Sequence, residues 1–218
     1  MKKLDIIYED KELLVVNKES GILTIGTDKD KFNTLYHEVR EYIRKKNQKV
    51  FIVNRLDKDT SGIVVFAKNE RLKESLQINW NDIAKRYYYA IVEGHVKESQ
   101  KTLKDYLFET KTLEVFVSKN NNGKLAILKY DLLNYYNEFS VLDIEIKTGR
   151  RNQIRCQLAN INHPIVGDKK YHSKKNPIRR LGLHAYKLSL KNPLNNKSYE
   201  FIAKVPKNFQ QFFQKNEK

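Results

Sequence analysis

A polar stretch between two short apolar runs holds the side chains of this sequence that are best suited to chemistry. It is the segment Asn54-Arg-Leu-Asp-Lys-Asp-Thr-Ser-Gly62, which is expected to form a loop between two buried strands, where catalytic groups often concentrate. Asp57 lies two residues from Arg55, whose positive charge favours the ionised and therefore nucleophilic carboxylate. Thr60 and the residues that follow it suit a tight turn. The segment alone leaves two interpretations open, a catalytic aspartate loop and an ordinary turn.

A second candidate is the basic segment Thr148-Gly-Arg-Arg-Asn-Gln-Ile-Arg155. It is expected to open a helix over residues 151–161, with Arg151 and Arg155 four residues apart on one helical face. Like charges in this arrangement repel each other, so an anion is expected beside them. The pattern allows three environments for this pair: RNA phosphate, an acidic side chain such as Asp57, or only water.

The charge balance of the whole chain indicates a polyanionic partner. The 218 residues include 42 Lys or Arg and 26 Asp or Glu, which gives a net charge of +16. Basic clusters such as 44–46, 150–151 and 169–180 are spread along the chain, so a folded surface that neutralises phosphates fits better than a disordered arm. A solvated lysine-rich surface is the other interpretation. Membrane attachment is disfavoured, because no expected helix opposes a basic face to a broad apolar one.

Composition and motif spacing disfavour several other kinds of site. A single cysteine, Cys156, cannot form an internal disulfide or a structural zinc site, and a reducing compartment is therefore favoured. Apolar runs are short, as at 63–67, whereas a membrane span needs about 20 residues. No glycine-rich phosphate loop occurs, and the five histidines lack paired ligand spacing. The sequence predicts a cytoplasmic protein that uses no metal and no cofactor, with Cys156 in its core.

Hydrophobic patterning predicts many strands and few helices. Because these strands do not alternate regularly with helices, the predicted class is α+β with a mainly antiparallel sheet. No internal repeat or linker separates the chain, so a single domain is expected. Strands are expected at residues 4–8, 13–16, 50–53, 63–67, 86–92, 113–117, 142–146, 183–190 and 199–205, and helices at 32–43, 70–80, 151–161 and near the carboxyl end.

Several motifs, taken together and in this order, resemble the RluA-type pseudouridine synthases, which isomerise uridine in structured RNA. The Arg-Leu-Asp-x-x-Thr-Ser-Gly and Gly-Arg-x-x-Gln-Ile-Arg elements are the specific ones. The motifs are Tyr8-Glu-Asp with Val15-Val-Asn-Lys, Arg55-Leu-Asp-Lys-Asp-Thr-Ser-Gly, Arg86-Tyr-Tyr-Tyr-Ala-Ile-Val-Glu-Gly, Gly149-Arg-Arg-Asn-Gln-Ile-Arg, His163-Pro-Ile-Val-Gly-Asp and Leu181-Gly-Leu-His-Ala.

The resemblance implies the fold and the activity. It implies an α+β catalytic fold, a mainly antiparallel mixed sheet flanked by helices, with a central active-site cleft. Residues 1–218 would form a single catalytic domain without the separate amino-terminal RNA-binding domain that many relatives carry. The implied enzyme is a cytoplasmic monomer that flips a specific uridine out of structured RNA, ribosomal RNA first and transfer RNA second, and isomerises it. It needs neither metal nor cofactor, since no group is exchanged with a second substrate.

The resemblance also implies roles for individual residues. Asp57 would be the catalytic aspartate, Tyr88 would pack against the target uracil and help to deprotonate C5, and Arg155 would pair with the aspartate. Whether the carboxylate forms an adduct or acts through a glycal stays open at this point. The implied substrate-binding residues are Arg55 near the gap left by the flipped base, Thr60 in the same loop, and Ile154 and Leu183 as apolar walls.

Departures from the family pattern bear on the target site rather than on the catalytic groups. Asn54 stands where histidine is frequent, Arg151-Asn152 where Thr-His is frequent, Gln157 where histidine is frequent, and Glu19 where proline usually follows lysine. The residues leave two other functions open. One is an RNA-binding or ribosome-assembly module without catalysis, and the other is an enzyme of free nucleosides, which the positive charge disfavours.

Overall fold

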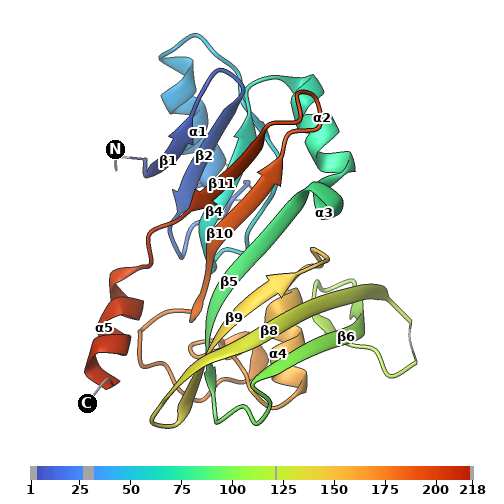
Figure 1. The fold of residues 1–218 in the computed structure, drawn as a ribbon, viewed down its shortest axis with the longest axis vertical. Coiled ribbons are helices and arrows are strands. Elements are labelled where there is room, and N and C mark those ends of the chain that lie inside the picture. Colours follow the sequence, from blue (N-terminus) through green and yellow to red (C-terminus); the bar gives the residue numbers. More distant parts are fainter. Residues whose placement is uncertain (1–3, 27–31, 121, 217–218) are drawn as a thin grey trace. The chain divides into compact units, whose positions relative to one another are not determined.

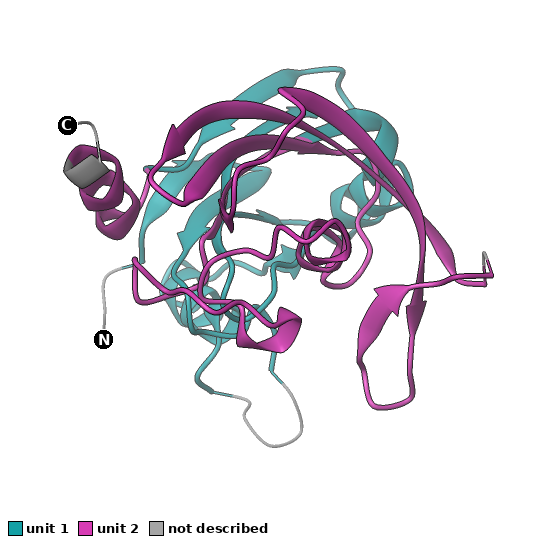
Figure 2. Cartoon of the chain, turned by 90° about the horizontal axis from the view of Figure 1, so that it is seen from below, with its two compact units in different colours: residues 1–85, 185–204 teal, residues 86–184, 205–218 magenta. Residues whose placement is uncertain are grey.

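The chain folds into two compact units, each with its own hydrophobic core. The computed structural model describes residues 4–26, 32–120 and 122–216 (Figure 1). Unit 1 comprises residues 1–85 and 185–204, and unit 2 comprises residues 86–184 and 205–218 (Figure 2). The predicted α+β class with mainly antiparallel strands is confirmed.

Unit 1 is a sheet covered by helices on both faces. Its strands run in the order β1-β2-β4-β10, with β3 paired to β4 and β11 paired to β10. All seven residues of β4 are buried, as expected of a strand with both faces covered. The strands are β1 (Ile6–Glu9), β2 (Leu13–Lys18), β3 (Phe51–Ile52), β4 (Ser61–Ala67), β10 (Leu183–Lys191, whose first two residues belong to unit 2) and β11 (Ser198–Ile202).

The two helical faces of unit 1 follow from the alternation of β2 and β4. Leu14 and Val64 pack with helix α1 (Leu35–Arg44), while Leu13 and Val65 pack with helix α2 (Glu70–Ile78). Helix α1 begins later than predicted, because the side chain of Thr34 accepts a hydrogen bond from the N–H of His37 and caps it. Phe32 therefore lies outside the helix and is exposed. The predicted helix 70–80 is likewise split into α2 and the short α3 (Trp80–Ile83).

Unit 2 is an antiparallel sheet with the strand order β5-β9-β8-β6-β7. Its helix α4 (Gln153–Asn160) lies on one face, where Cys156 packs with Leu107, Val115 and Ala126. Burial raises the pKa of Cys156 to about 11, so the thiol is protonated at neutral pH and the predicted core role is confirmed. The remaining elements are β5 (Ala84–Glu93), β6 (Gln100–Glu109), β7 (Val115–Val117), β8 (Lys124–Tyr136), β9 (Phe139–Ile146), the 3-10 helix η1 (Lys169–Tyr171) and α5 (Lys207–Asn216).

The predicted carboxyl-terminal helix is present as α5, and it docks on the core of unit 2. Phe209 and Phe212 pack with Tyr136, Phe139 and Ile178. Within the described residues, no helix is both long and apolar enough to cross a membrane.

Strands β6 and β8 were not predicted, and the predicted strand 113–117 begins at Val115 instead. Leu113 is half-exposed and has a left-handed backbone with φ 63°, so it belongs to the turn before β7.

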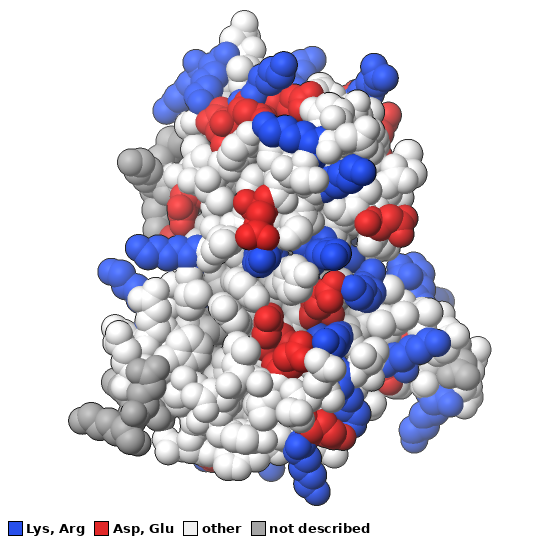
Figure 3. All heavy atoms as spheres, viewed as in Figure 1, with Lys and Arg blue, Asp and Glu red and all other residues white. Residues whose placement is uncertain are grey.

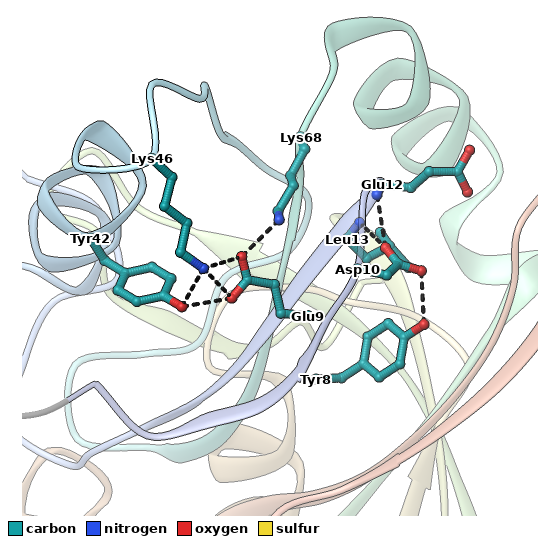
Figure 4. A network of polar contacts seen from close by, with 8 residues as sticks. All are labelled: Tyr8, Glu9, Asp10, Glu12, Leu13, Tyr42, Lys46 and Lys68. Atoms are coloured by element: carbon teal, nitrogen blue, oxygen red, sulfur yellow. Dashed lines mark hydrogen bonds and ion pairs between the residues drawn. The ribbon is translucent and has the colours of Figure 1, made fainter.

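A charged network ties β1 to α1 and β4 in unit 1 (Figure 4). The carboxylate of Glu9 accepts hydrogen bonds from Lys46 Nζ at 2.8 and 2.9 Å, from Lys68 Nζ at 2.8 Å and from Tyr42 Oη at 2.7 Å. Burial alone raises the pKa of Glu9, but these donors outweigh burial and lower it from 4.5 to about 2. The network therefore stabilises the folded unit with Glu9 ionised.

We expect the contribution of Glu9 to stability to disappear at acid pH. Because the pKa is lower in the folded state, the contribution is complete above pH 4.5 and is lost as the pH falls toward about 2. Urea unfolding of the wild type and of Glu9→Gln should therefore differ most near neutral pH and converge below about pH 3. A stability difference that is independent of pH would contradict the assignment.

Candidate active site

The predicted catalytic loop lies between β3 and β4 of unit 1, as the sequence indicated. Asp57 is half-buried in it, and the N–H of Thr60 donates to the carbonyl oxygen of Asp57 at 3.2 Å. Thr60 is 2% exposed, and its Oγ1 is buried without a hydrogen-bond partner among the described residues. Arg55 is exposed. The loop thus holds a half-buried carboxylate and an exposed cation two residues apart in the sequence, and the bond from Thr60 closes a turn after Asp57.

A buried lysine binds the backbone of this loop. Lys18 is fully buried, and its Nζ donates to the carbonyl oxygens of Glu19, Ile22 and Lys58 at 2.8 to 2.9 Å. The last of these carbonyls belongs to the residue after Asp57. The early Val-Val-Asn-Lys motif and the aspartate loop are therefore parts of one structure.

Further bonds fix the backbone on both sides of Asp57. Thr24 Oγ1 donates to the carbonyl oxygen of Leu56 at 2.7 Å, and Ser20 Oγ donates to that of Asp59 at 2.6 Å. At the end of the loop, a Cβ on Gly62 would lie 2.2 Å from the carbonyl oxygen of Ala185, and the φ of Gly62 is +120°. This position therefore requires glycine.

We expect Lys18→Met to loosen the aspartate loop. The apolar replacement has a similar length but leaves three carbonyl oxygens without their common donor, which should lower the free energy of unfolding by about 2–4 kcal/mol. Urea unfolding measures the change, and Lys58→Met, which alters an exposed lysine of the same loop, is the matched control. Equal stability of the two variants would show that Lys18 does not support the loop.

Unit 2 carries the other predicted site residues on buried elements. Tyr88 lies in β5 opposite Ile144 of β9 and is 8% exposed. Ile154 is buried in α4, and Leu183 is buried at the first position of β10. The apolar character predicted for Ile154 and Leu183 is thus accompanied by burial in the core.

Arg155 is a buried charged group of unit 2 with several fixed contacts. It is 9% exposed, and its Nε and Nη2 donate to Oδ2 and Oδ1 of Asp168 at 2.7 and 2.8 Å. Its Nη1 donates to Oδ1 of Asn152 at 3.1 Å, and its guanidinium lies 5.3 Å from the centre of the Tyr171 ring. A bidentate pair of this kind fixes both the position and the plane of the guanidinium.

The partners of Arg155 are themselves held in place. The Asp168 side chain is 1% exposed, and its Oδ1 also accepts from the N–H of Tyr171 at 3.3 Å. Burial raises the pKa of Tyr171 to about 12, and its Oη donates to the carbonyl oxygen of Val115 at 3.0 Å. Asn152 has a left-handed backbone, with φ 50°. Asp168 is thus a functional candidate to which the sequence assigned no role, although it ends the His-Pro-Ile-Val-Gly-Asp motif.

The prediction that Arg151 and Arg155 share a helical face is wrong. Helix α4 begins at Gln153, whose Oε1 accepts from the N–H of Arg150 at 3.1 Å, so Arg151 precedes the helix. Arg151 is exposed and pairs with Glu109 at 3.1 Å. Each arginine therefore has its own carboxylate. The expected pairing of Arg155 with Asp57 stays a prediction.

The seven predicted site residues fall into two groups. Unit 1 holds Asp57, Arg55 and Thr60 in one loop, and unit 2 holds Tyr88, Arg155, Ile154 and Leu183. In the part of the chain that the structure describes, no group of three His, Cys, Asp or Glu is arranged to hold a metal ion. Unit 1 thus offers a carboxylate for chemistry, and unit 2 offers a fixed guanidinium and a tyrosine.

Comparisons with known proteins point to one family. Residues 12–160 match the family model described as RNA pseudouridylate synthase. The chain is 33% identical over 215 residues to an uncharacterized RNA pseudouridine synthase of Mycoplasma pneumoniae, and the match covers 94% of this chain and 68% of that protein. It is also 33% identical over 215 residues to ribosomal large subunit pseudouridine synthase D of Borreliella burgdorferi, covering 94% and 66%.

Solved structures show the same fold. The structure titled human RNA pseudouridylate synthase domain containing 4 is similar with a TM-score of 0.79 at 20% identity, covering 96% of this chain and 92% of that one.

Proposed function

We propose that this chain, which belongs to the RNA pseudouridylate synthase family, converts a specific uridine of structured RNA into pseudouridine. Its family and its relatives indicate that it is an isomerase that acts on RNA. We further propose ribosomal RNA as the substrate, since relatives carry the name ribosomal large subunit pseudouridine synthase, and transfer RNA is the second candidate. The observation that carries the proposal is the Asp57 loop, which has the family's motif and is fixed by Lys18 and Thr24.

The reaction needs a carboxylate and a confined base. The N1–C1′ bond breaks, the uracil turns, and a C5–C1′ bond forms, with no redox change and no second substrate. Asp57 would carry the reaction, either by adding to the base or sugar or by deprotonating the sugar, and both routes use the same carboxylate. The detached uracil must be retained throughout, which an aromatic face and apolar walls can do. Tyr88, Ile154 and Leu183 are proposed for that task.

Arg155 is proposed to keep the carboxylate of Asp57 ionised. The geometry within unit 2 supports a fixed role for it, since three of its nitrogens are already bonded to Asp168 and Asn152. A guanidinium held in this way needs little reorganisation when the substrate binds, which favours electrostatic catalysis.

Access to the target atoms would require the uridine to be flipped out of its stack. Extrusion costs a few kcal/mol, which contacts to the RNA backbone can offset. Arg55 is exposed in the loop and is proposed to contact the space or backbone around the flipped nucleotide. Thr60, which follows Asp57 by three residues and has a buried hydroxyl, is proposed to assist substrate binding there. The enzyme is further proposed to be monomeric and cytoplasmic.

Removal of the Tyr88 hydroxyl should slow turnover and leave the fold intact. Tyr88→Phe keeps the ring in β5 but deletes the group that is proposed to help deprotonate C5, so we expect a fall in kcat of about 10²-fold. Tritium release from RNA labelled at C5 of uridine measures the rate. Tyr130→Phe is the matched control, since Tyr130 is also a buried tyrosine of unit 2. A Tyr88→Phe rate equal to wild type would refute the proton-transfer role.

The function itself is tested by comparing substrates. We expect the purified protein to release tritium from folded, C5-labelled uridine RNA and not from free uridine. RNA binding with a steep salt dependence but without any pseudouridine would favour the binding or assembly module instead. Comparable activity on free uridine would favour a nucleoside enzyme.

A further inference from the structure

The residues that follow Asp168 form a strongly basic loop in unit 2. We call residues 169–180 the basic loop, and they include six Lys or Arg and no Asp or Glu. On the face drawn in Figure 3, basic side chains are interspersed with acidic ones. The basic loop therefore concentrates positive charge without an acid in its own sequence.

One carboxylate, that of Glu93, binds the basic loop. Oε1 of Glu93 accepts from Ser173 Oγ at 2.6 Å and from the N–H groups of Lys174 and Lys175 at 2.7 Å each. The N–H of Gly167 donates to the carbonyl oxygen of Lys175 at 2.8 Å. These bonds fix the path of the loop. Oε1 of Glu93 is thereby occupied by backbone and hydroxyl donors.

Two residues of the basic loop have left-handed backbones, His172 with φ 62° and Arg179 with φ 56°. Neither is glycine, so each conformation carries some strain that the surrounding bonds must offset. The loop is thus held in a defined shape.

The six cations of the basic loop divide by their contacts. Arg180 is part of the fold, because its guanidinium lies 5.4 Å from the Phe209 ring centre and donates to the carbonyl oxygen of Leu183. Lys175 pairs with Glu138 at 3.2 Å, with both side chains more than half exposed. Lys170 Nζ donates to the carbonyl oxygen of Leu113 at 3.1 Å.

The remaining three cations point to a partner outside the chain. Lys169, Lys174 and Arg179 are exposed, and among the residues that the structure describes their side chains make no hydrogen bond or ion pair. Three exposed cations on a fixed backbone lose less conformational freedom when they bind an anion than the same cations on a flexible tail.

The surroundings of the basic loop fit a nucleic acid better than a lipid surface. Amphipathic segments that bind a membrane surface insert apolar side chains into the lipid. None of the large apolar side chains that are exposed in the described chain lies between residues 169 and 180, where Tyr171 is half-buried and Ile178 is buried. Phosphate groups of RNA require only cations and N–H donors.

We propose that Lys169, Lys174 and Arg179 bind phosphate groups of the RNA substrate. This inference rests on the proposed function for its choice of RNA. Asp168 precedes the basic loop directly and holds Arg155, so the same short segment positions a predicted catalytic group and presents the phosphate-binding cations. Phosphates held there would anchor the RNA backbone close to Arg155.

The test measures RNA binding separately from turnover. The triple variant Lys169→Gln/Lys174→Gln/Arg179→Gln is made in an Asp57→Asn chain, and its affinity for a fluorescent uridine-containing stem–loop RNA is measured over a range of KCl concentrations. Because each lost phosphate contact removes about 0.7–0.9 from the slope of log Kd against log salt, we expect the slope to fall by about 2–3. The affinity near physiological salt should fall by about tenfold or more.

A second triple variant controls for net charge. Lys97→Gln/Lys191→Gln/Lys204→Gln removes three positive charges from exposed positions outside the basic loop, and it should leave the slope nearly unchanged. Equal losses in both triples, or no loss in the first, would overturn the proposal. Vesicles of phosphatidylcholine and phosphatidylglycerol provide another arm, and loop-dependent binding to vesicles without any effect on RNA would also overturn it.

This outcome is separable from that of the proposed function. In one outcome, the wild-type chain forms no pseudouridine while the first triple loses salt-dependent RNA binding. That result would refute the enzyme and retain the basic loop. Normal turnover by the wild-type chain, together with unchanged RNA binding by the first triple, would refute the role of the basic loop and retain the enzyme.

Discussion

Replacement of Asp57 by asparagine is expected to abolish pseudouridine formation while the protein remains folded. The amide has the same size as the carboxylate, but it can neither add to the base or sugar nor take a proton. Loss of an essential nucleophile or base typically lowers kcat by about 10⁴-fold or more. Tritium release under single-turnover conditions measures the remaining rate.

The control for this variant is its affinity for RNA. Asp57→Asn removes one negative charge and no phosphate-binding group, so its Kd for folded RNA should stay within about threefold of wild type. Asp59→Asn, which alters an exposed aspartate of the same loop, should turn over at nearly the wild-type rate. A rate for Asp57→Asn close to that of Asp59→Asn would remove Asp57 from the mechanism.

The second large effect is expected at Asp168, the partner of Arg155. Asp168→Ala leaves a buried guanidinium without its bidentate acceptor, and removal of one member of a buried ion pair costs about 3–5 kcal/mol. Urea unfolding at neutral pH should show this loss. Asp131→Ala is the matched control, because Asp131 pairs with Lys129 at 3.5 Å on the surface, where such a pair contributes about 0–1 kcal/mol.

A double variant separates the ion pair from other functions of Asp168. In Asp168→Ala/Arg155→Met the unpaired charge is gone, so part of the stability should return. If Asp168→Ala were as stable as Asp131→Ala, or if the double variant were less stable than Asp168→Ala, the role assigned to this pair would be refuted.

The location of Asp57 could be predicted from the sequence because local patterns determine it. The apolar runs before and after the Arg-Leu-Asp segment are short and continuous, which is typical of strands in a sheet with both faces covered. The polar residues between them could only form a loop. Lys18 as its support was not predicted, since nothing in the Val-Val-Asn-Lys motif says that the lysine is buried against three carbonyls.

The environment of Arg155 could not be predicted because it depends on a turn and a loop. Asn152 adopts a left-handed backbone, which starts the helix two residues later than expected and leaves Arg151 outside it. Asp168 reaches Arg155 across 13 residues that include the end of the helix and two turns. No helical or strand periodicity brings those positions together.

Strands β6 and β8 were missed because only one of their faces is apolar, and that face is sparse. In β6 the inward positions are Leu103, Asp105 and Leu107, and the aspartate is tolerated because Gln157 Nε2 donates to it at 2.6 Å. In β8 the register shifts between Leu132 and Asn134, which interrupts the alternation. A buried polar pair and a bulge both interrupt the alternation of apolar and polar residues by which a strand is recognised.

The most direct measurement of the central claim uses RNA from a strain that lacks this gene. That RNA is incubated with the purified wild-type chain or with Asp57→Asn, digested to nucleosides, and its pseudouridine content is determined by liquid chromatography and mass spectrometry. The account predicts that the pseudouridine content rises with the wild type and not with Asp57→Asn. No rise with the wild type, or an equal rise with both proteins, would contradict it.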